Sequence, residues 1–189
     1  MPKSASLRFY AAADEAPGQA RKNRSQSKGM REEHRTMLAI KKMEKQDVQA
    51  VMLFEAELRR QEPDTYFWEP DETYRRQLER SFDDARFNTA MSFLAVKDKK
   101  VIGRIDASLL ASRSDASCYS AYLDWICVLK SERHHQVAQA LLHALKAECK
   151  KQGAGVLIAL MADNEEAQRF YQSVQDASIH DTGIWMEIK

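Results

Sequence analysis

The sequence has no hydrophobic stretch long enough to cross a membrane. A membrane-spanning helix needs about 20 consecutive apolar residues, and no run in these 189 residues approaches that length. The N-terminus also lacks the apolar segment of a secretory signal peptide. These two absences predict that the protein has no membrane partner.

Cysteine is also scarce. The three cysteines, Cys118, Cys127 and Cys149, are an odd number and lack the spacing of metal ligands. We therefore expect no metal site, and a reduced, cytoplasmic compartment fits best. Cys127 in a predicted strand and Cys149 on an apolar helix face are most simply small core residues.

The chain has little net charge. Its 29 Lys and Arg and 28 Asp and Glu residues give +1 at neutral pH, so the charge balance makes nucleic acid an improbable partner. The charge is unevenly distributed, however. Residues 1–36 hold eight basic and four acidic side chains, a net charge of +4, which leaves −3 for the rest of the chain.

Residues 1–36 are also poor in large apolar side chains and rich in Ser, Ala, Gln, Lys and Arg. Such a segment cannot bury enough apolar surface to offset the entropy lost on ordering. We expect a disordered basic tail, or an extension upstream of a later start at Met30 or Met37. The alternative is a basic arm that contacts RNA or acidic partners. Residues 37–189 are predicted to form a single domain.

Hydrophobic periodicity divides the remaining chain into strands and helices. Apolar and β-branched runs predict strands, and apolar residues three or four apart predict helices. The predicted strands are 38–43, 89–96, 101–111, 117–128, 155–161 and 183–189. The predicted helices are 48–58, 71–85, 137–151 and 165–173. This order indicates a mixed α/β sheet with helices packed on it. The continuous apolar run 155–161 predicts a strand that is covered on both faces.

Residues 122–142 combine a strand, a basic turn and the start of a helix. The turn contains Arg133 and two histidines, and the helix begins near Val137. The N–H groups of a helix's first turn have no intrahelical acceptor, and the helix dipole adds positive potential there. The stretch therefore predicts a site for a phosphorylated cofactor. The alternative, from this stretch alone, is an ordinary connection with a solvated basic turn.

Two segments resemble motifs of the GNAT superfamily of acyl-CoA-dependent N-acyltransferases. Residues 128–142, Val-Leu-Lys-Ser-Glu-Arg-His-His-Gln-Val-Ala-Gln-Ala-Leu-Leu, are similar to the family's pyrophosphate loop, Val-x-Pro-x-x-Arg-[Gly/Arg]-x-Gly-x-[Gly/Ala]-x-x-Leu. Residues 164–171, Asn-Glu-Glu-Ala-Gln-Arg-Phe-Tyr, match the family's Asn-x-x-Ala-x-x-[Phe/Leu]-Tyr. The resemblance covers residues 38–189. It implies an α/β fold with a mixed, mostly antiparallel central sheet, a splayed strand pair and four flanking helices.

The resemblance implies acetyl-CoA as the co-substrate, bound largely by backbone groups. The pyrophosphate would lie on the loop and the helix start, and the pantetheine arm would pair with the preceding strand. The residues predicted to bind it are Ile126, Cys127, Val128, Arg133, His134, His135, Gln136, Val137, Ala138, Gln139, Asn164 and Tyr171. Gln136 departs from the family pattern, which has glycine there. Its side chain would crowd the phosphates unless the backbone keeps a negative φ.

The same resemblance assigns the chemistry. Acyl transfer to an amine needs a base for the ammonium proton, a donor for the oxyanion and an acid for the leaving thiolate. Tyr171 matches the family's tyrosine that protonates the thiolate; its alternative is a core aromatic. Asp124 is the predicted base, directly or through water, and its alternative is a hydrogen-bonded strand carboxylate. The backbone N–H of Cys127 or Val128 is the expected oxyanion donor.

The acceptor pocket of the family is shaped by the first two helices and their connection. Here that connection contains Tyr66 and Trp68 together with carboxylates, and Asp106 lies on a later strand. We predict these three residues to bind the acceptor. Aromatic walls with carboxylates suit a cationic amine. The alternative is that the aromatic side chains only pack the connection onto the sheet.

The predicted function is transfer of the acetyl group from acetyl-CoA to a primary amine of a small molecule or peptide, by direct attack in a ternary complex. A homodimer is the candidate assembly. Two alternatives stay open. One is a catalytically silent domain of this fold that binds CoA or a protein partner, which Gln136 favours. The other is an RNA- or ribosome-associated module led by the basic tail.

Overall fold

A computed structural model describes residues 38–66, 68–111, 113, 119–180, 183, 184, 186 and 188. The predicted tail 1–36 and Cys118 lie outside these residues. Within them, no helix is both long enough and apolar enough to cross a membrane.

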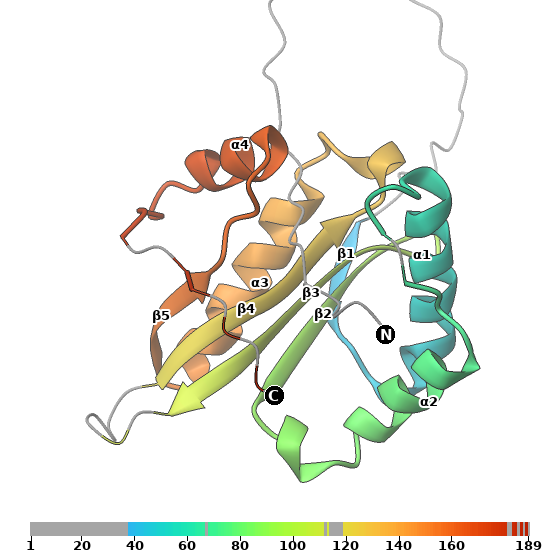
Figure 1. The fold of residues 1–189 in the computed structure, drawn as a ribbon, viewed down its shortest axis with the longest axis horizontal. Coiled ribbons are helices and arrows are strands. Elements are labelled where there is room, and N and C mark those ends of the chain that lie inside the picture. The colour runs from blue at the N-terminus through green and yellow to red at the C-terminus, as the bar shows by residue number, and fades with distance from the viewer. Residues whose placement is uncertain are drawn as a thin grey trace, which may run out of the picture.

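A five-stranded sheet forms the centre of the molecule, with its strands in sequence order (Figure 1). The strands are β1 (Ala39–Lys42), β2 (Ala90–Lys97), β3 (Lys100–Ala111), β4 (Tyr119–Val128) and β5 (Ala154–Ala159). The first three strand pairs are antiparallel, and β4 and β5 are parallel. The predicted mixed, mostly antiparallel sheet is confirmed.

Helices cover both faces of this sheet (Figure 1). They are α1 (Val48–Gln61), α2 (Glu72–Ser81), α3 (Val137–Lys151) and α4 (Glu165–Ser173). Neighbouring residues of β3 show which helix lies on which face. A side chain at Gly103 would meet Leu141 of α3 at 3.1 Å, whereas Arg104 donates a 3.0 Å hydrogen bond to Glu55 of α1. Since successive residues of a strand face opposite sides, α1 and α3 lie on opposite faces.

The apolar stripe of α3 packs on the sheet as its sequence predicts. The buried residues are Val137, Ala138, Leu141, Leu142, Leu145 and Cys149. Gly103 allows this close packing, because a Cβ there would also meet Val128 at 3.2 Å. The N-terminus of α3 is thereby held next to the end of β4.

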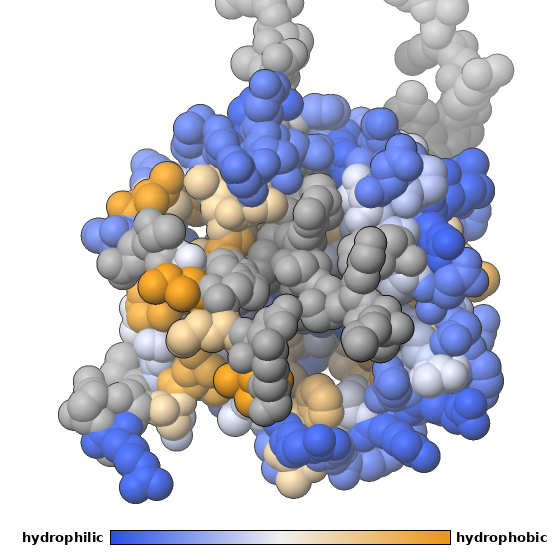
Figure 2. Space-filling view, viewed as in Figure 1, coloured by the Kyte–Doolittle hydropathy of each residue, from blue (hydrophilic) through white to orange (hydrophobic). Residues whose placement is uncertain are grey.

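The prediction that residues 155–161 form a strand covered on both faces is wrong. β5 is the edge strand of the described sheet, and Val156 and Ile158 are 52% and 44% exposed. Figure 2 shows hydrophobic surface gathered on the β5 side of the molecule, whereas the side of α1 and α2 is mostly hydrophilic.

Two element boundaries also differ from the prediction. α2 ends at Ser81 rather than near residue 85, because the Asp84 carboxylate accepts the Arg86 N–H at 2.9 Å and starts a separate 3-10 turn, Ala85–Phe87. The described residues of the predicted strand 183–189, which are Gly183, Ile184, Met186 and Ile188, are not in a strand. The rest of that segment lies outside the described residues.

Candidate active site

A gap opens between β4 and β5. The two strands pair from Tyr119 and Ala154 to Leu123 and Ala159, but β4 continues to Val128. Beyond Leu123, the β4 edge that faces away from β3 has no paired strand among the described residues. Unpaired backbone groups on a strand edge can bind an extended ligand as an added strand would.

One hydrogen bond determines which backbone groups face the gap. The N–H of Leu129, the residue after β4, donates to the carbonyl of Ile102 in β3 at 2.9 Å. Because successive residues of a strand direct their N–H and C=O groups to opposite edges, Cys127 directs its groups toward β3. Ile126 and Val128 direct theirs toward the gap. Of the two predicted oxyanion donors, Val128 therefore has the suitable orientation.

The Cys127 side chain lies away from solvent. It is buried, and the indole N–H of Trp125 donates to its Sγ at 2.8 Å. Burial raises the pKa of the Cys127 thiol well above its usual value. The thiol is therefore protonated at neutral pH and does not act as a nucleophile.

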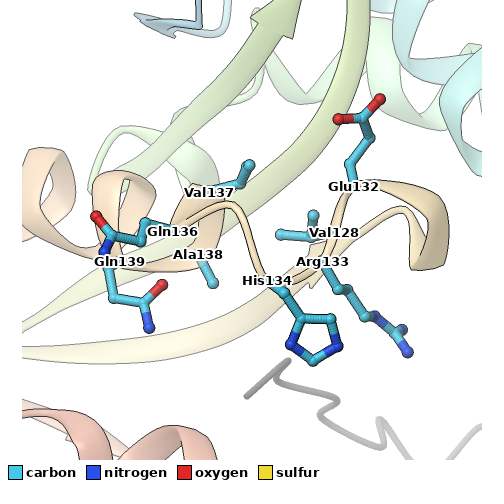
Figure 3. A pocket seen from close by; sticks show the side chains of 8 residues that line it. All are labelled: Val128, Glu132, Arg133, His134, Gln136, Val137, Ala138 and Gln139. Atoms are coloured by element: carbon cyan, nitrogen blue, oxygen red, sulfur yellow. The ribbon is translucent and has the colours of Figure 1, made fainter. Parts of the chain in front are cut away.

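The first turn of α3, which follows the loop from β4, contains backbone N–H groups that have no intrahelical acceptor. Within α3, the Ala140 N–H donates to the Gln136 carbonyl at 3.0 Å. The three preceding N–H groups, of Val137, Ala138 and Gln139, belong to the helix's first turn, which has no intrahelical acceptor. The pocket beside this loop is lined by Val128, Glu132, Arg133, His134, Gln136, Val137, Ala138 and Gln139 (Figure 3). Such a pocket at a helix N-terminus suits a phosphate group.

Gln136 has the backbone conformation of a glycine. Its φ is 59° and its ψ is 20°, in the left-handed region, and His134 has a φ of 66°. The negative φ that would make a glutamine compatible with the phosphates is therefore absent. Left-handed backbone costs a non-glycine residue about 1–2 kcal/mol. Figure 3 shows the Gln136 side chain directed toward Gln139 and away from Arg133 and His134.

Arg133 does not present its guanidinium to this pocket as an unpaired cation. Its Nη1 and Nη2 donate to the two carboxylate oxygens of Glu62 at 3.0 and 2.5 Å. Its Nη1 also lies 3.0 Å from Glu166 Oε1. The Arg133 side chain is only 8% exposed. Its role as a phosphate ligand stays a prediction. In this structure its guanidinium is paired with two carboxylates.

α4 brings a buried hydroxyl to the site. Asn164 is its N-cap, and its Oδ1 accepts the Ala167 N–H at 2.8 Å. Two turns later, the Tyr171 hydroxyl is buried and makes no hydrogen bond to any residue that the structure describes. Burial, followed by the nearby Tyr122, raises the pKa of Tyr171 to about 12. The hydroxyl therefore keeps its proton at neutral pH and has no competing partner there.

Asp124 is a β-bulge on β4. The β3–β4 register pairs Asp106 with Trp125 and Ala107 with Leu123, which leaves Asp124 as the extra residue. Its Oδ2 accepts the Ser108 hydroxyl at 2.9 Å. Burial raises the pKa of Asp124, the Ser108 bond lowers it, and the charge of Asp106 raises it, with a net upward shift. A carboxylate with a raised pKa is a stronger base than an exposed one.

The sequence profile of the Acetyltransferase (GNAT) family matches residues 50–175. The chain belongs to this acetyltransferase family. None of the curated proteins matches the sequence. The membership agrees with the resemblance of residues 128–142 and 164–171.

Solved GNAT-like structures have the same fold. An aminoglycoside acetyltransferase from an uncultured soil metagenomic sample, in complex with sisomicin, aligns over 80% of this chain and 97% of its own, with 16% identity and a TM-score of 0.67. AAC(6')-Iy, in complex with the bisubstrate analog CoA-S-monomethyl-acetylneamine, aligns over 82% and 100%, with 20% identity and a TM-score of 0.65. A ribosomal-protein-alanine N-acetyltransferase from Brucella melitensis biovar Abortus 2308 aligns over 79% and 99%, with 16% identity and a TM-score of 0.61.

A buried polar network lies on the α1–α2 side of this GNAT sheet. Glu55 is 2% exposed and accepts hydrogen bonds from Arg104 at 3.0 Å, Trp68 at 3.2 Å and Tyr74 at 3.2 Å. Arg104 also lies 2.8 Å from Asp106. Burial raises the pKa of Glu55, and the Arg104 charge opposes that shift. Asp106 is therefore part of a paired network that anchors α1 and α2 to β3.

The predicted acceptor residues differ in accessibility. Tyr66 is 0% exposed, and its ring packs edge-on against Trp68 and Trp125, with centroids 5.3 and 5.8 Å away. Tyr66 thus lies in the core beneath the acceptor side, while Trp68 is half-buried. Their substrate-binding role stays a prediction.

Several residues of the site lacked a sequence signal. Glu62, Ser108, Tyr122, Glu55 and Arg104 contact the predicted residues but belong to neither family motif, and Glu166 occupies a variable position of the 164–171 motif. His135 is exposed. Within the part of the chain that the structure describes, no group of three His, Cys, Asp or Glu side chains could hold a metal ion.

Proposed function

We propose that this GNAT protein transfers the acetyl group of acetyl-CoA to a primary amine of a small molecule or peptide, by direct attack in a ternary complex. The observation that carries the proposal is the gap beyond Leu123 and Ala159. Asp124 on β4 and Tyr171 on α4 are the ionisable groups that we assign to it. Each has a raised pKa that suits its proposed task.

Three sets of described residues would bind acetyl-CoA. The N–H groups of Val137, Ala138 and Gln139 at the start of α3 would bind the pyrophosphate. The backbone groups of Ile126 and Val128 would pair with the amides of the pantetheine arm. The Asn164 side chain would contribute its amide N–H, because its Oδ1 already caps α4. When bound, the cofactor supplies the activated acetyl thioester.

The residues of the chain then have separate tasks. Asp124 takes a proton from the acceptor ammonium, so that the neutral amine can attack the carbonyl carbon. The Val128 N–H donates to the oxyanion that forms. Tyr171 donates its proton to the sulfur as the C–S bond breaks. The attacking nitrogen loses a second proton to solvent as the amide forms. Asp124 then releases its proton to solvent and Tyr171 regains one, so an ammonium and the thioester give an amide, a thiol and one released proton.

The acceptor that the site favours is cationic. Asp106 and Asp124 lie close enough for the charge of Asp106 to raise the pKa of Asp124, and Trp68 and Trp125 pack beside them with centroids 5.1 Å apart. Carboxylates with aromatic walls attract ammonium groups. The acetyltransferase of the same fold that is in complex with sisomicin supports a small-molecule amine as the acceptor.

Calorimetry with acetyl-CoA, followed by a thiol-release assay over a panel of aminoglycosides, polyamines and peptide N-termini, tests the proposal. We expect acetyl-CoA to bind and at least one amine to release CoA thiol. A protein that does not bind acetyl-CoA at millimolar concentration would not be this transferase.

A catalytically silent CoA-binding domain is the second candidate, and the strained backbone at Gln136 favours it. Such a protein would bind acetyl-CoA and release no thiol with any amine in the panel. Its Tyr171→Phe variant would also behave as the wild type in every measurement.

A further inference from the structure

The clearest unexplained feature of the structure is a buried arginine between two carboxylates. Arg133 lies on the cofactor loop, Glu62 follows the last residue of α1, and Glu166 lies in the first turn of α4. These residues come from three parts of the chain, and Glu62 and Arg133 are 71 positions apart. Together they carry one positive and two negative charges, so the cluster is not built as an anion site.

The Glu62–Arg133 pair has the geometry of a structural tie. Both terminal nitrogens of Arg133 bond the two oxygens of Glu62, which is the bidentate arrangement that fixes orientation as well as distance. The neighbouring residues add a second tie, because Gln61 Oε1 accepts the Ser131 N–H at 3.2 Å and Gln61 Nε2 donates to Ser131 Oγ at 3.3 Å. The end of α1 is thus bonded to the cofactor loop at two adjacent positions.

Glu62 also begins the connection between α1 and α2, which we call the acceptor connection (residues 62–71). Its carbonyl accepts the N–H groups of Thr65 and Tyr66, each at 3.1 Å. The backbone of Glu62 therefore shapes the start of the acceptor connection, while its side chain holds the cofactor loop. A movement of the Arg133 side chain would therefore be transmitted, through Glu62, to the start of the acceptor connection.

Glu166 connects the same arginine to the proposed acid. It lies on α4 between the cap Asn164 and Tyr171, and its Oε1 is 3.0 Å from Arg133 Nη1. Burial raises the pKa of Glu166, and the Arg133 charge opposes that shift. The position of α4 relative to the cofactor loop thus depends on Arg133 as well.

We infer that Glu62, Arg133 and Glu166 form a positioning bridge that couples the cofactor loop to the acceptor connection and to the helix that carries Tyr171. This inference rests on the proposed function. Binding of acetyl-CoA reduces the motion of the cofactor loop, and through the bridge it also reduces the backbone motion at Thr65 and Tyr66. Arg133 acts through its two carboxylates and does not serve as a ligand of the pyrophosphate.

Amide hydrogen exchange, measured by NMR with and without acetyl-CoA, tests the bridge. In the wild type, acetyl-CoA should slow exchange in residues 134–140 and also, by about fivefold, at Thr65 and Tyr66. In Glu62→Gln, the slowing in 134–140 should persist, and the slowing at Thr65 and Tyr66 should be lost. The matched control is Asp83→Asn, which breaks an exposed ion pair with Lys45 away from the bridge and should behave as the wild type.

Arg133→Lys provides a second variant if Glu62→Gln does not fold. It keeps the charge but loses the fork, and it should also lose the slowing at Thr65 and Tyr66. The bridge is refuted if wild-type exchange at these two amides ignores acetyl-CoA, or if both variants keep the response. It is also refuted if Glu62→Gln binds acetyl-CoA more tightly, because a freed Arg133 would then be serving the pyrophosphate. Absence of acetyl-CoA binding to the wild type would instead refute the proposed function itself, together with the coupling built on it.

Discussion

The two halves of the candidate site are built from different materials. The cofactor half uses mostly backbone groups: the edge of β4 and the first turn of α3. The acceptor half uses side chains, namely the network of Glu55, Arg104 and Asp106 with its aromatic neighbours. Backbone donors depend on loop conformation and tolerate many side chains, whereas a buried charge network depends on each of its members. Substitutions should therefore act very differently in the two halves.

The largest effect should follow from breaking the acceptor network. Arg104→Met leaves Glu55 and Asp106 buried without their cation, which typically lowers the free energy of unfolding by about 3–5 kcal/mol. Without the Arg104 charge, the pKa of Glu55 rises further. A carboxyl whose pKa is higher in the folded than in the unfolded protein destabilises the folded state more as pH rises. The loss of unfolding free energy should therefore be greater at pH 7 than at pH 5. Chemical denaturation at both pH values measures this.

The matched control is Arg60→Met, which removes a cation from an exposed pair with Glu57. Surface pairs contribute little, and this variant should unfold almost as the wild type does. Equal losses in the two variants would show that burial of the network has no energetic importance.

The second-largest effect should be on the catalytic rate and not on stability. Tyr171→Phe should lower kcat by about 100-fold, because it removes the proposed acid, and leave the Kd for acetyl-CoA unchanged. Since the hydroxyl makes no hydrogen bond to a described residue, its removal leaves no partner unsatisfied. The Tm should therefore stay the same or rise. Unchanged turnover would remove Tyr171 from the mechanism.

Asp124→Asn should have a smaller effect, about 30-fold on kcat/KM, because water can replace part of the base's role. In the wild type, kcat/KM should fall as pH drops through the raised pKa of Asp124, and this acid limb should vanish in the variant. Ser108→Ala removes the bond that lowers this pKa, so it should move the limb to higher pH. An acid limb that stays in Asp124→Asn would identify another base.

Gln136→Gly should act mildly and in the favourable direction. It removes about 1 kcal/mol of backbone strain, which should raise the stability of the protein. It also removes the side chain at the position where the family has glycine, so calorimetry should show a Kd for acetyl-CoA lower by about three- to fivefold. The control is Gln139→Gly, which lies in helical backbone and should weaken binding. If the two glycines had the same effect on Kd, the side chain at position 136 would not matter for the cofactor.

The smallest effect is expected from deleting residues 1–36. If residues 37–189 form the domain by themselves, acetyl-CoA affinity and Tm should both be unchanged in the shortened protein. A large loss of either would make the basic segment part of the fold or of the site.

Local patterns predicted the secondary structure around the proposed cofactor site, because it depends on residues close in sequence, whereas the binding roles of these residues stay predictions. The cap at Asn164, the stripe of α3 and the strand before it follow from spacings of a few residues. The partners of Arg133 could not be predicted, because Glu62 carries no motif and meets it only after folding. The exposure of Val156 and Ile158 was likewise hidden, because an apolar run does not reveal that its strand lies at an edge.

The bulge at Asp124 has a consequence for the length of β4. The register on both sides of it is regular, so β4 contains one residue more than its pairing with β3 requires. A chain that lacked this residue could keep Trp125 opposite Asp106 and Leu123 opposite Ala107. That shorter strand would be the more regular one, and it would have no carboxylate at this position beside the gap.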